Sequence, residues 1–284
     1  MLRLTEIKLA LDHDAAALRT TALRLLGVAD VALQTVRIRR RGYDARGGDI
    51  RLVYTLDVEV SDEAALLKKF HGHPRIVPTP DETYRYPVTM AASPARRPVV
   101  IGTGPCGLFA ALSLARMGLQ PLVLERGRKV RARSRDVWGF WRQRRFNAQS
   151  NVQFGEGGAG TFSDGKLYSG IKDRGHHIRR IYQDFVDCGA PEEILYLSKP
   201  HIGTLRLVKV VEALREQIIR AGGEVRFEST VTDIKIENYQ ARGVVLANGE
   251  TIATDQVVLA VGHSARDTFT MLQARGVPIE PKPF

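Results

Sequence analysis

Two glycine-rich stretches carry the residue types best suited to holding a phosphate-bearing ligand. They are "VVIGTGPCGLFAALSLARMG" and "NVQFGEGGAGTFSDGK". Both match the spacing G-x-G-x-x-G, at Gly102, Gly104 and Gly107 and again at Gly155, Gly157 and Gly160. After a strand and before a helix, this spacing brings backbone amides close to a pyrophosphate. The first question is therefore whether the chain holds two dinucleotide loops or one.

The first stretch has the surroundings that a dinucleotide turn requires, namely a strand before it, a helix after it and an acid about 20 residues on. "PVVI" precedes it, an apolar stripe of helical spacing follows, and "PLVLE" ends in Glu125. Gly102 permits the tight turn, Gly104 admits the pyrophosphate and Gly107 allows close helix packing. A carboxylate at Glu125 would accept both ribose hydroxyls and repel a 2′-phosphate. FAD or NAD is therefore favoured over NADP.

The second stretch lacks these surroundings. "NVQF" is short and polar for a central strand, and Gly165 and Gly170 stand where a helix should follow. We therefore predict no second Rossmann turn and no separate nicotinamide domain. Small residues still allow close approach of the backbone to a ligand at positive φ.

The elements that position these loops divide the chain into three parts. Residues 1–75 read as β-α-β-β-α, typical of a small α+β domain of ferredoxin-like type, with Ser61 as the N-cap of its second helix. Residues 76–97 are rich in proline and predict a linker. Residues 98–284 alternate apolar strands with helices and predict a parallel α/β domain.

The segment after residue 204 favours FAD over NAD. A helical stripe ends at Gly222 and Gly223, strands and a hairpin through Asn248 and Gly249 follow, and "QVVLAVG" closes the pattern. This order resembles the FAD-binding domain of flavoproteins built like glutathione reductase and p-hydroxybenzoate hydroxylase. The resemblance implies a Rossmann-like parallel sheet with a three-stranded meander. It also implies that the strand of Val231 passes the adenine and that the Gly262 backbone approaches the cofactor.

Further motifs resemble a family of largely uncharacterised bacterial FAD-dependent dehydrogenases over nearly the whole chain. They include "RIRRRGYDAR", "LVYTLDVEV", "SNVQFGEGGAGTFSDGKL" and "VVLAVGHSARDTF". Members of that family are roughly twice as long, so this chain resembles their amino-terminal half with an incomplete FAD domain. We therefore expect the isolated chain to bind FAD weakly or not at all.

The same resemblance gives the second loop a role. In related flavoproteins a glycine-rich loop at this distance after the ribose-binding Glu folds over the cofactor. The residues expected to contact FAD are Gly102, Gly104, Pro105, Cys106, Gly107, Glu125, Arg126, Arg133, Gly157, Gly158, Ala159, Gly160, Val231 and Gly262. Asp164 and Lys166 are candidates for proton transfer and for stabilising a reduced flavin, with a plain loop salt bridge as the alternative.

The composition restricts the remaining possibilities. The formal net charge is +11, and nine basic residues lie between Arg126 and Arg145 against one acid, Asp136, which predicts contact with a polyanion or a merely solvated face. The two cysteines, Cys106 and Cys188, form no C-x-x-C, and the histidines fit no metal spacing. We find no signal segment or membrane-length apolar run and expect a cytoplasmic protein.

Three functions therefore stay open at this stage. An FAD-dependent oxidoreductase, possibly truncated, is favoured. The alternatives are an FAD protein that acts on or binds tRNA or RNA through its basic surface, and a non-catalytic fragment with a dinucleotide fold.

Overall fold

The computed structural model describes residues 1–88, 95–173 and 175–281, and the chain divides into two compact units. The first unit comprises residues 1–84, 167–183 and 191–201, and the second comprises residues 85–166, 184–190 and 202–284. The sequence predicted one continuous domain over 98–284. The structure instead groups two segments between the second glycine loop and the following helix with the amino-terminal unit.

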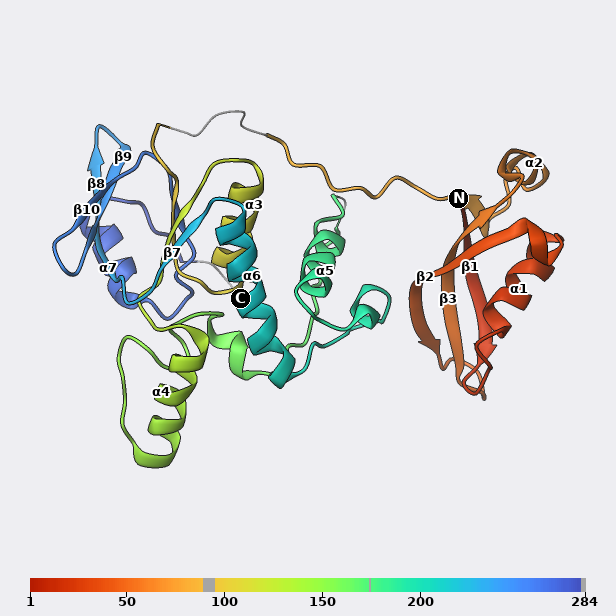
Figure 1. The fold of residues 1–284 in the computed structure, drawn as a ribbon, viewed down its shortest axis with the longest axis horizontal. Helices are drawn as coiled ribbons and strands as arrows, with labels where there is room; N and C mark the ends of the chain where they lie inside the picture. Colours follow the sequence, from red (N-terminus) through yellow and green to blue (C-terminus); the bar gives the residue numbers. More distant parts are fainter. Residues whose placement is uncertain (89–94, 174, 282–284) are drawn as a thin grey trace. The chain divides into compact units, whose positions relative to one another are not determined.

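The first unit is built on a four-stranded antiparallel sheet of order β2-β3-β1-β4 (Figure 1). Its elements are β1 (Leu2–Ala10), α1 (Ala17–Leu26), η1 (Asp30–Ala32), β2 (Leu33–Asp44), β3 (Arg51–Val60), α2 (Glu63–Lys69), β4 (Ile76–Pro78), the start of α5 (His177–Asp187) and η3 (Glu192–Leu195). The alternating apolar residues of β1 and β3 give this sheet one buried face, because successive strand side chains point to opposite sides.

Two details of the first unit differ from the sequence prediction. Ile76–Pro78, predicted as linker, forms strand β4, and its three residues pair with Leu2, Arg3 and Leu4 of β1. The N-cap of α2 is Asp62, not Ser61, because the Asp62 carboxylate accepts a hydrogen bond from the Ala65 amide at 3.0 Å. Gly27 ends α1 in the left-handed conformation, with φ of 66°.

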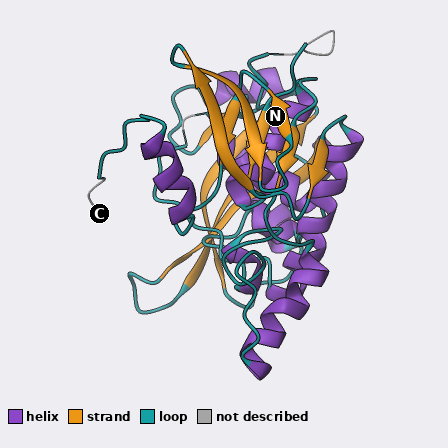
Figure 2. Ribbon diagram, turned by 90° about the vertical axis from the view of Figure 1, so that its left-hand side faces the viewer, coloured by secondary structure: helices purple, strands orange, loops and turns teal. Residues whose placement is uncertain are grey.

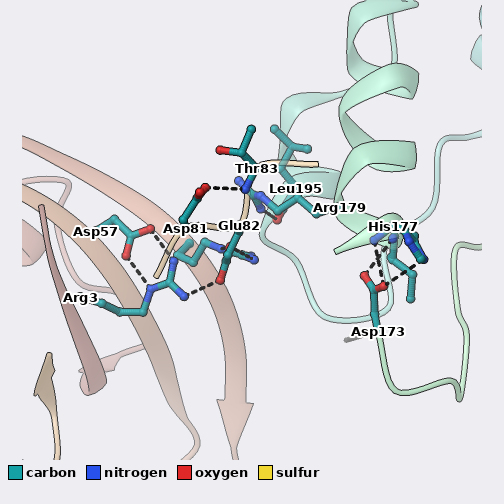
Figure 3. A network of polar contacts seen from close by, with 11 residues as sticks. Arg3, Asp57, Asp81, Glu82, Thr83, Asp173, His177, Arg179 and Leu195 are labelled. Carbon is teal, nitrogen blue, oxygen red and sulfur yellow. Dashed lines mark hydrogen bonds and ion pairs between the residues drawn. The ribbon is translucent and has the colours of Figure 1, made fainter. Parts of the chain in front are cut away.

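A polar network fixes the segment that leaves β4 (Figure 3). The Arg3 guanidinium donates to Asp57 at 2.7 Å and to Glu82 at 2.6 Å, and Arg39 Nε donates to Glu82 at 2.8 Å. Burial raises the pKa of Glu82, but the hydrogen bonds from Arg3 and Arg39 outweigh it and lower that pKa to about 2. Glu82 therefore stays ionised between two arginines at neutral pH.

The second unit holds a parallel sheet of order β11-β5-β6-β7 and an antiparallel meander of order β10-β9-β8. Figures 1 and 2 show helices packed beside these strands. Its elements are β5 (Val99–Ile101), α3 (Pro105–Arg116), β6 (Leu122–Leu124), α4 (Val130–Gln143), η2 (Ala159–Phe162), α6 (Thr204–Arg220), β7 (Glu224–Arg226), β8 (Val231–Glu237), β9 (Gln240–Leu246), β10 (Thr251–Ala253), β11 (Val257–Leu259) and α7 (Arg266–Ala274). The parallel sheet and the meander confirm the predicted fold class.

The two central parallel strands, β5 and β6, are short, fully apolar and buried, as expected for strands covered on both faces. Helix α3 starts at Pro105, where the missing amide proton does no harm, and buries Leu108, Ala111, Leu112 and Ala115. The apolar stripe read from the sequence is therefore the face that packs on the sheet. Within the described ranges, no helix has the length and apolar character of a membrane span.

Candidate functional site

A cavity of about 530 Å³ opens at the carboxyl ends of β5, β6 and β11 in the second unit. This is where ligands bind in open parallel sheets, and the volume lies in the usual range of ligand sites. Its wall includes eleven of the residues predicted to contact a cofactor: Gly102, Gly104, Pro105, Cys106, Glu125, Arg126, Gly158, Ala159, Gly160, Val231 and Gly262. Residues far apart in the sequence thus converge on one site.

The first glycine turn is sterically restricted at two of its three glycines. A Cβ on Gly107 would lie 1.9 Å from the Gly102 carbonyl oxygen, and a Cβ on Gly102 would lie 2.5 Å from the Ala260 oxygen. Gly107 does not line the cavity, which agrees with the packing role that the sequence gave it. At Gly104, by contrast, the nearest atom to a Cβ is Gly158 Cα at 3.8 Å, an ordinary van der Waals distance, so the chain itself tolerates a Cβ at this position on the cavity wall.

Glu125 is held in place by groups of the first turn. Its Oε2 accepts hydrogen bonds from the Thr103 amide at 2.8 Å and from the Thr103 hydroxyl at 2.7 Å, and its Oε1 accepts one from the Gly127 amide at 2.9 Å. The carboxylate is buried but borders the cavity. Thr103 was not among the predicted contacts, although a hydroxyl within a glycine turn is a sequence signal for such a role.

The second glycine loop lies directly against the first. The Gly157 amide donates to the Thr103 carbonyl at 2.9 Å. A Cβ on Gly158, where φ is +65°, would lie 2.9 Å from Gly104 Cα. Gly157 itself stays outside the cavity, and its Cβ would collide with the Thr161 hydroxyl. The two loops therefore form adjacent walls of one site, and the second has neither a preceding strand nor a following α-helix.

Arg133 does not occupy the place that the sequence suggested. It is fully buried and absent from the cavity wall, so the expected direct contact with a cofactor phosphate is not supported. Its guanidinium donates to three backbone carbonyls, those of Asn151 at 2.8 Å, Val152 at 2.8 Å and Glu156 at 2.6 Å. Burial lowers the pKa of Arg133 to about 10, although the negative charges of Glu125 and Glu156 oppose this effect. Arg133 thus holds the chain on both sides of Gly155.

Glu156 also holds the second glycine loop in place, through contacts to α4 and α6. Its carboxylate accepts from the Val130 amide at 2.7 Å, at the start of α4, and pairs with Arg215 of α6 at 2.7 Å. Burial raises the pKa of Glu156, while the Val130 hydrogen bond and Arg215 oppose this effect. The middle residue of "GEG" is therefore structural.

Arg126 and Phe154 both line the cavity and contact each other. The Arg126 guanidinium stacks 4.4 Å from the Phe154 ring centre, and it forms an ion pair with Asp267 at 3.0 Å. Ser229 lies on the same wall, and its amide donates to the Glu125 carbonyl at 2.9 Å. Phe154 and Ser229 were not among the predicted contacts, because nothing in their local sequence marks them.

The two catalytic candidates lie outside the cavity wall. Asp164 and Lys166 pair with each other at 3.5 Å, and both side chains are largely exposed. This geometry is the loop salt bridge that the sequence left as the alternative. Across the residues that the structure describes, no group of three or more His, Cys, Asp or Glu is placed to hold a metal.

Family models match three stretches of the chain. A domain of unknown function covers residues 1–59, an NAD(P)-binding Rossmann-like domain covers residues 100–156, and the FAD dependent oxidoreductase family covers residues 196–283. Both glycine loops and Glu125 lie in the second match, and Val231 and Gly262 lie in the third. These matches identify the second unit as a dinucleotide-binding domain of the FAD-dependent oxidoreductase type, with FAD as its cofactor.

A relative covers the whole chain. An uncharacterized protein of Clostridium beijerinckii is 40% identical over 284 residues, which are 100% of this chain and 52% of that protein. The chain therefore spans about half the length of this curated relative.

Two solved structures are similar to part of the chain at low identity. THI4 of Thermovibrio ammonificans is 19% identical, with 64% of each chain covered and a TM-score of 0.42. Thioredoxin reductase of Lactococcus lactis is 17% identical, with 58% of this chain and 34% of that chain covered and a TM-score of 0.31.

Proposed function

We propose that the chain is the FAD-binding part of an FAD-dependent dehydrogenase. The observation that carries this proposal is the convergence of Glu125 and both glycine loops on one cavity. A Cβ at Gly158 would collide with the first turn, whereas one at Gly104 would meet only Gly158 Cα, at an ordinary van der Waals distance of 3.8 Å. The site is thus shaped for a ligand that approaches the backbone closely, which fits a dinucleotide.

Different residues of the site bind different parts of FAD. The N-cap of α3 is Gly104, which has no capping side chain, so the first-turn amides are left for the pyrophosphate. Glu125 accepts the ribose hydroxyls, and Thr103 and the Gly127 amide orient its carboxylate. Backbone atoms of Gly158, Ala159 and Gly160 border the flavin side. When bound, FAD supplies two-electron chemistry by accepting or releasing a hydride.

The finer assignments belong to the same proposal. We assign the chain to the bacterial FAD-dependent dehydrogenases that its motifs resemble, supported by 40% identity over its full length to the Clostridium protein. We class the first unit as ferredoxin-like, since its order is β-α-β-β-α-β and its sheet order is β2-β3-β1-β4. Both cysteines are free thiols, which supports a reducing, cytoplasmic compartment.

Equilibrium dialysis against FAD at micromolar to millimolar concentrations tests the proposal. We expect one FAD per chain, bound weakly and reached only toward the millimolar end of the range, with an absorption band near about 450 nm. Gly104→Ala should weaken FAD binding at least about tenfold without changing the melting temperature, because its Cβ fills the pyrophosphate position. Gly48→Ala, in the first unit, is the matched control, since no atom lies within 4 Å of its Cβ and it lies outside the cavity wall. Equal FAD affinity of the wild type and Gly104→Ala would contradict the proposal.

A further inference from the structure

Helix α4 ends in an exposed group of aromatic side chains. Trp138, Phe140 and Trp141 lie in its last two turns and Phe146 follows it, and all four are between 41% and 64% exposed. A soluble protein rarely leaves several large aromatics uncovered in one place. In both ribbon views the end of α4 projects away from the sheet of its unit (Figures 1 and 2).

The register of α4 explains how the aromatics reach the surface. Val130, Arg133 and Val137 form its buried side. Phe140 and Trp141 lie three and four residues after Val137, so they continue that side beyond the point where the unit covers it. Trp138 and Trp141 meet edge to face at 5.3 Å between ring centres. Both rings nevertheless stay about half exposed to solvent.

The same segment carries arginines that the rest of the unit leaves unneutralised. Arg131 pairs with Glu212 at 2.7 Å and Arg128 pairs with Asp136 at 3.1 Å. For the part of the chain that the structure describes, no ion pair involves Arg142, Arg144 or Arg145, which are all exposed. The Arg142 guanidinium lies 4.7 Å from the Trp138 ring centre. We call these three arginines and the four aromatics the α4 patch.

We propose that the α4 patch binds single-stranded nucleic acid, with bases stacked on its aromatic rings and phosphates paired with its arginines. Stacking platforms beside cationic side chains are how proteins bind single strands without sequence preference. The net charge of +11 favours a polyanionic partner. The inference is independent of the FAD site.

The composition of the patch fits a nucleic-acid partner. From Trp138 to Phe146 every exposed apolar side chain is aromatic, and none is Leu, Ile, Val or Met. Flat aromatic rings are the side chains on which the bases of a single strand stack. Every cation in this stretch is arginine, which pairs bidentately with phosphate and stacks on bases.

The patch also adjoins the second glycine loop. Trp141 meets Phe162 edge to face at 6.3 Å, and Phe162 is the last residue of η2, whose first residue, Ala159, borders the cavity. A strand bound on the patch would therefore lie near the open side of that loop.

Intrinsic fluorescence gives a direct test, because the chain has 2 tryptophans and both belong to the patch. The full chain is titrated with a 12-nucleotide oligouridylate and, separately, with polyphosphate, which has the charge but no bases. We expect oligouridylate to quench the tryptophan emission and polyphosphate to leave it unchanged. The RNA affinity should fall about twentyfold between about 50 and 200 mM salt, as for three phosphate contacts.

Variants separate stacking from charge, with fluorescein-labelled oligouridylate as the probe and anisotropy as the readout. Trp138→Ala with Trp141→Ala should weaken binding at least about tenfold while the salt dependence stays. Arg142→Gln with Arg144→Gln and Arg145→Gln should weaken binding and flatten the salt dependence. Arg24→Gln with Tyr239→Ala, an exposed pair of the same types elsewhere, should leave binding unchanged.

Three results would overturn the proposal, and the wild-type titrations give them even if a variant fails to fold. The first is equal fluorescence change with polyphosphate and oligouridylate, or none with either. The second is a blue shift with vesicles of phosphatidylglycerol and phosphatidylcholine but no response to RNA, which would identify a lipid surface. The third is a blue shift that depends on protein concentration alone, which would identify a second copy of the chain.

Discussion

The loop at 102–107 joins a buried strand to a helix of 12 residues, whereas the loop at 155–160 leads only into a single 3-10 turn of 4 residues. The first is shaped by packing of its own βαβ unit. The second is held by long-range contacts, namely three bonds from Arg133 and one from the Gly157 amide to Thr103. The same letter pattern therefore marks a local motif in one place and a tertiary assembly in the other.

This difference predicts the largest effect at the packing glycine of the first loop. Gly107→Ala places a Cβ 1.9 Å from the Gly102 carbonyl, a backbone atom that cannot move away alone. We expect a loss of about 3 kcal/mol in the free energy of unfolding, measured by denaturant titration. Gly104→Ala is the matched control with little change in stability. If both variants unfolded alike, the first loop would not be set by local packing.

A large effect is also expected at the anchor of the second loop. Arg133→Lys keeps the charge but cannot reach three carbonyls at once, so two buried acceptors lose their donor. We expect a loss of about 2 kcal/mol in stability and weaker FAD binding. Arg135→Lys, on the exposed side of the same helix, should change neither property. If Arg133→Lys lowered the FAD affinity with no loss of stability, the result would instead indicate a direct contact between Arg133 and a phosphate of FAD.

A smaller effect is expected where the two loops touch. Gly158→Ala adds a Cβ 2.9 Å from Gly104 Cα at a φ of +65°, so the loops must separate slightly. We expect about 1 kcal/mol of destabilisation and an FAD affinity lowered more than stability alone would suggest. Gly48→Ala, a glycine of the first unit outside the cavity wall, should match the wild type. If Gly158→Ala left the FAD affinity unchanged, the second loop would not be part of the cofactor site.

The smallest effect concerns a thiol of the first loop. Cys106 is exposed on the cavity wall, whereas Cys188 is buried, and burial raises the pKa of the Cys188 thiol to about 11. Because the thiolate is the reactive form, Cys188 should react with iodoacetamide only as the pH rises toward that value. At pH 8 we expect labelling of Cys106 alone, by mass spectrometry, and slower labelling with FAD present. Equal labelling of Cys106 with and without FAD would place the cofactor elsewhere.

Sequence patterns predicted the parts of the molecule that local physics determines. The βαβ unit, Glu125 at its second strand and the hairpin of β9 and β10 follow from apolar periodicity, glycine positions and a turn pair, and the resemblance to FAD-binding domains implied the three-stranded meander. Ile76–Pro78 was missed because it becomes a strand only through its partner on β1. Phe154 and Ser229 were missed for the same reason, since only tertiary contacts bring them to the cavity.

Arg133 shows the limit of reasoning from charge. Arg133 is one of nine basic residues between Arg126 and Arg145, and the sequence predicted that it contacts a cofactor phosphate. The structure instead uses the planar fork of Arg133 to bind three carbonyls in the interior. The sequence does not distinguish Arg133 from the arginines at the end of the same helix. Those arginines are exposed, and they are the ones that we propose to contact a partner.

The central claim is that the two loops build one dinucleotide site, and calorimetric titration of the chain with FAD and then with NADH tests it most directly. We predict one FAD per chain, with an affinity lowered by Gly104→Ala and by Gly158→Ala alike. The contrary result is a second dinucleotide that binds alongside FAD and is lost in Gly158→Ala while FAD binding is kept. That outcome would make 155–160 a separate cofactor loop.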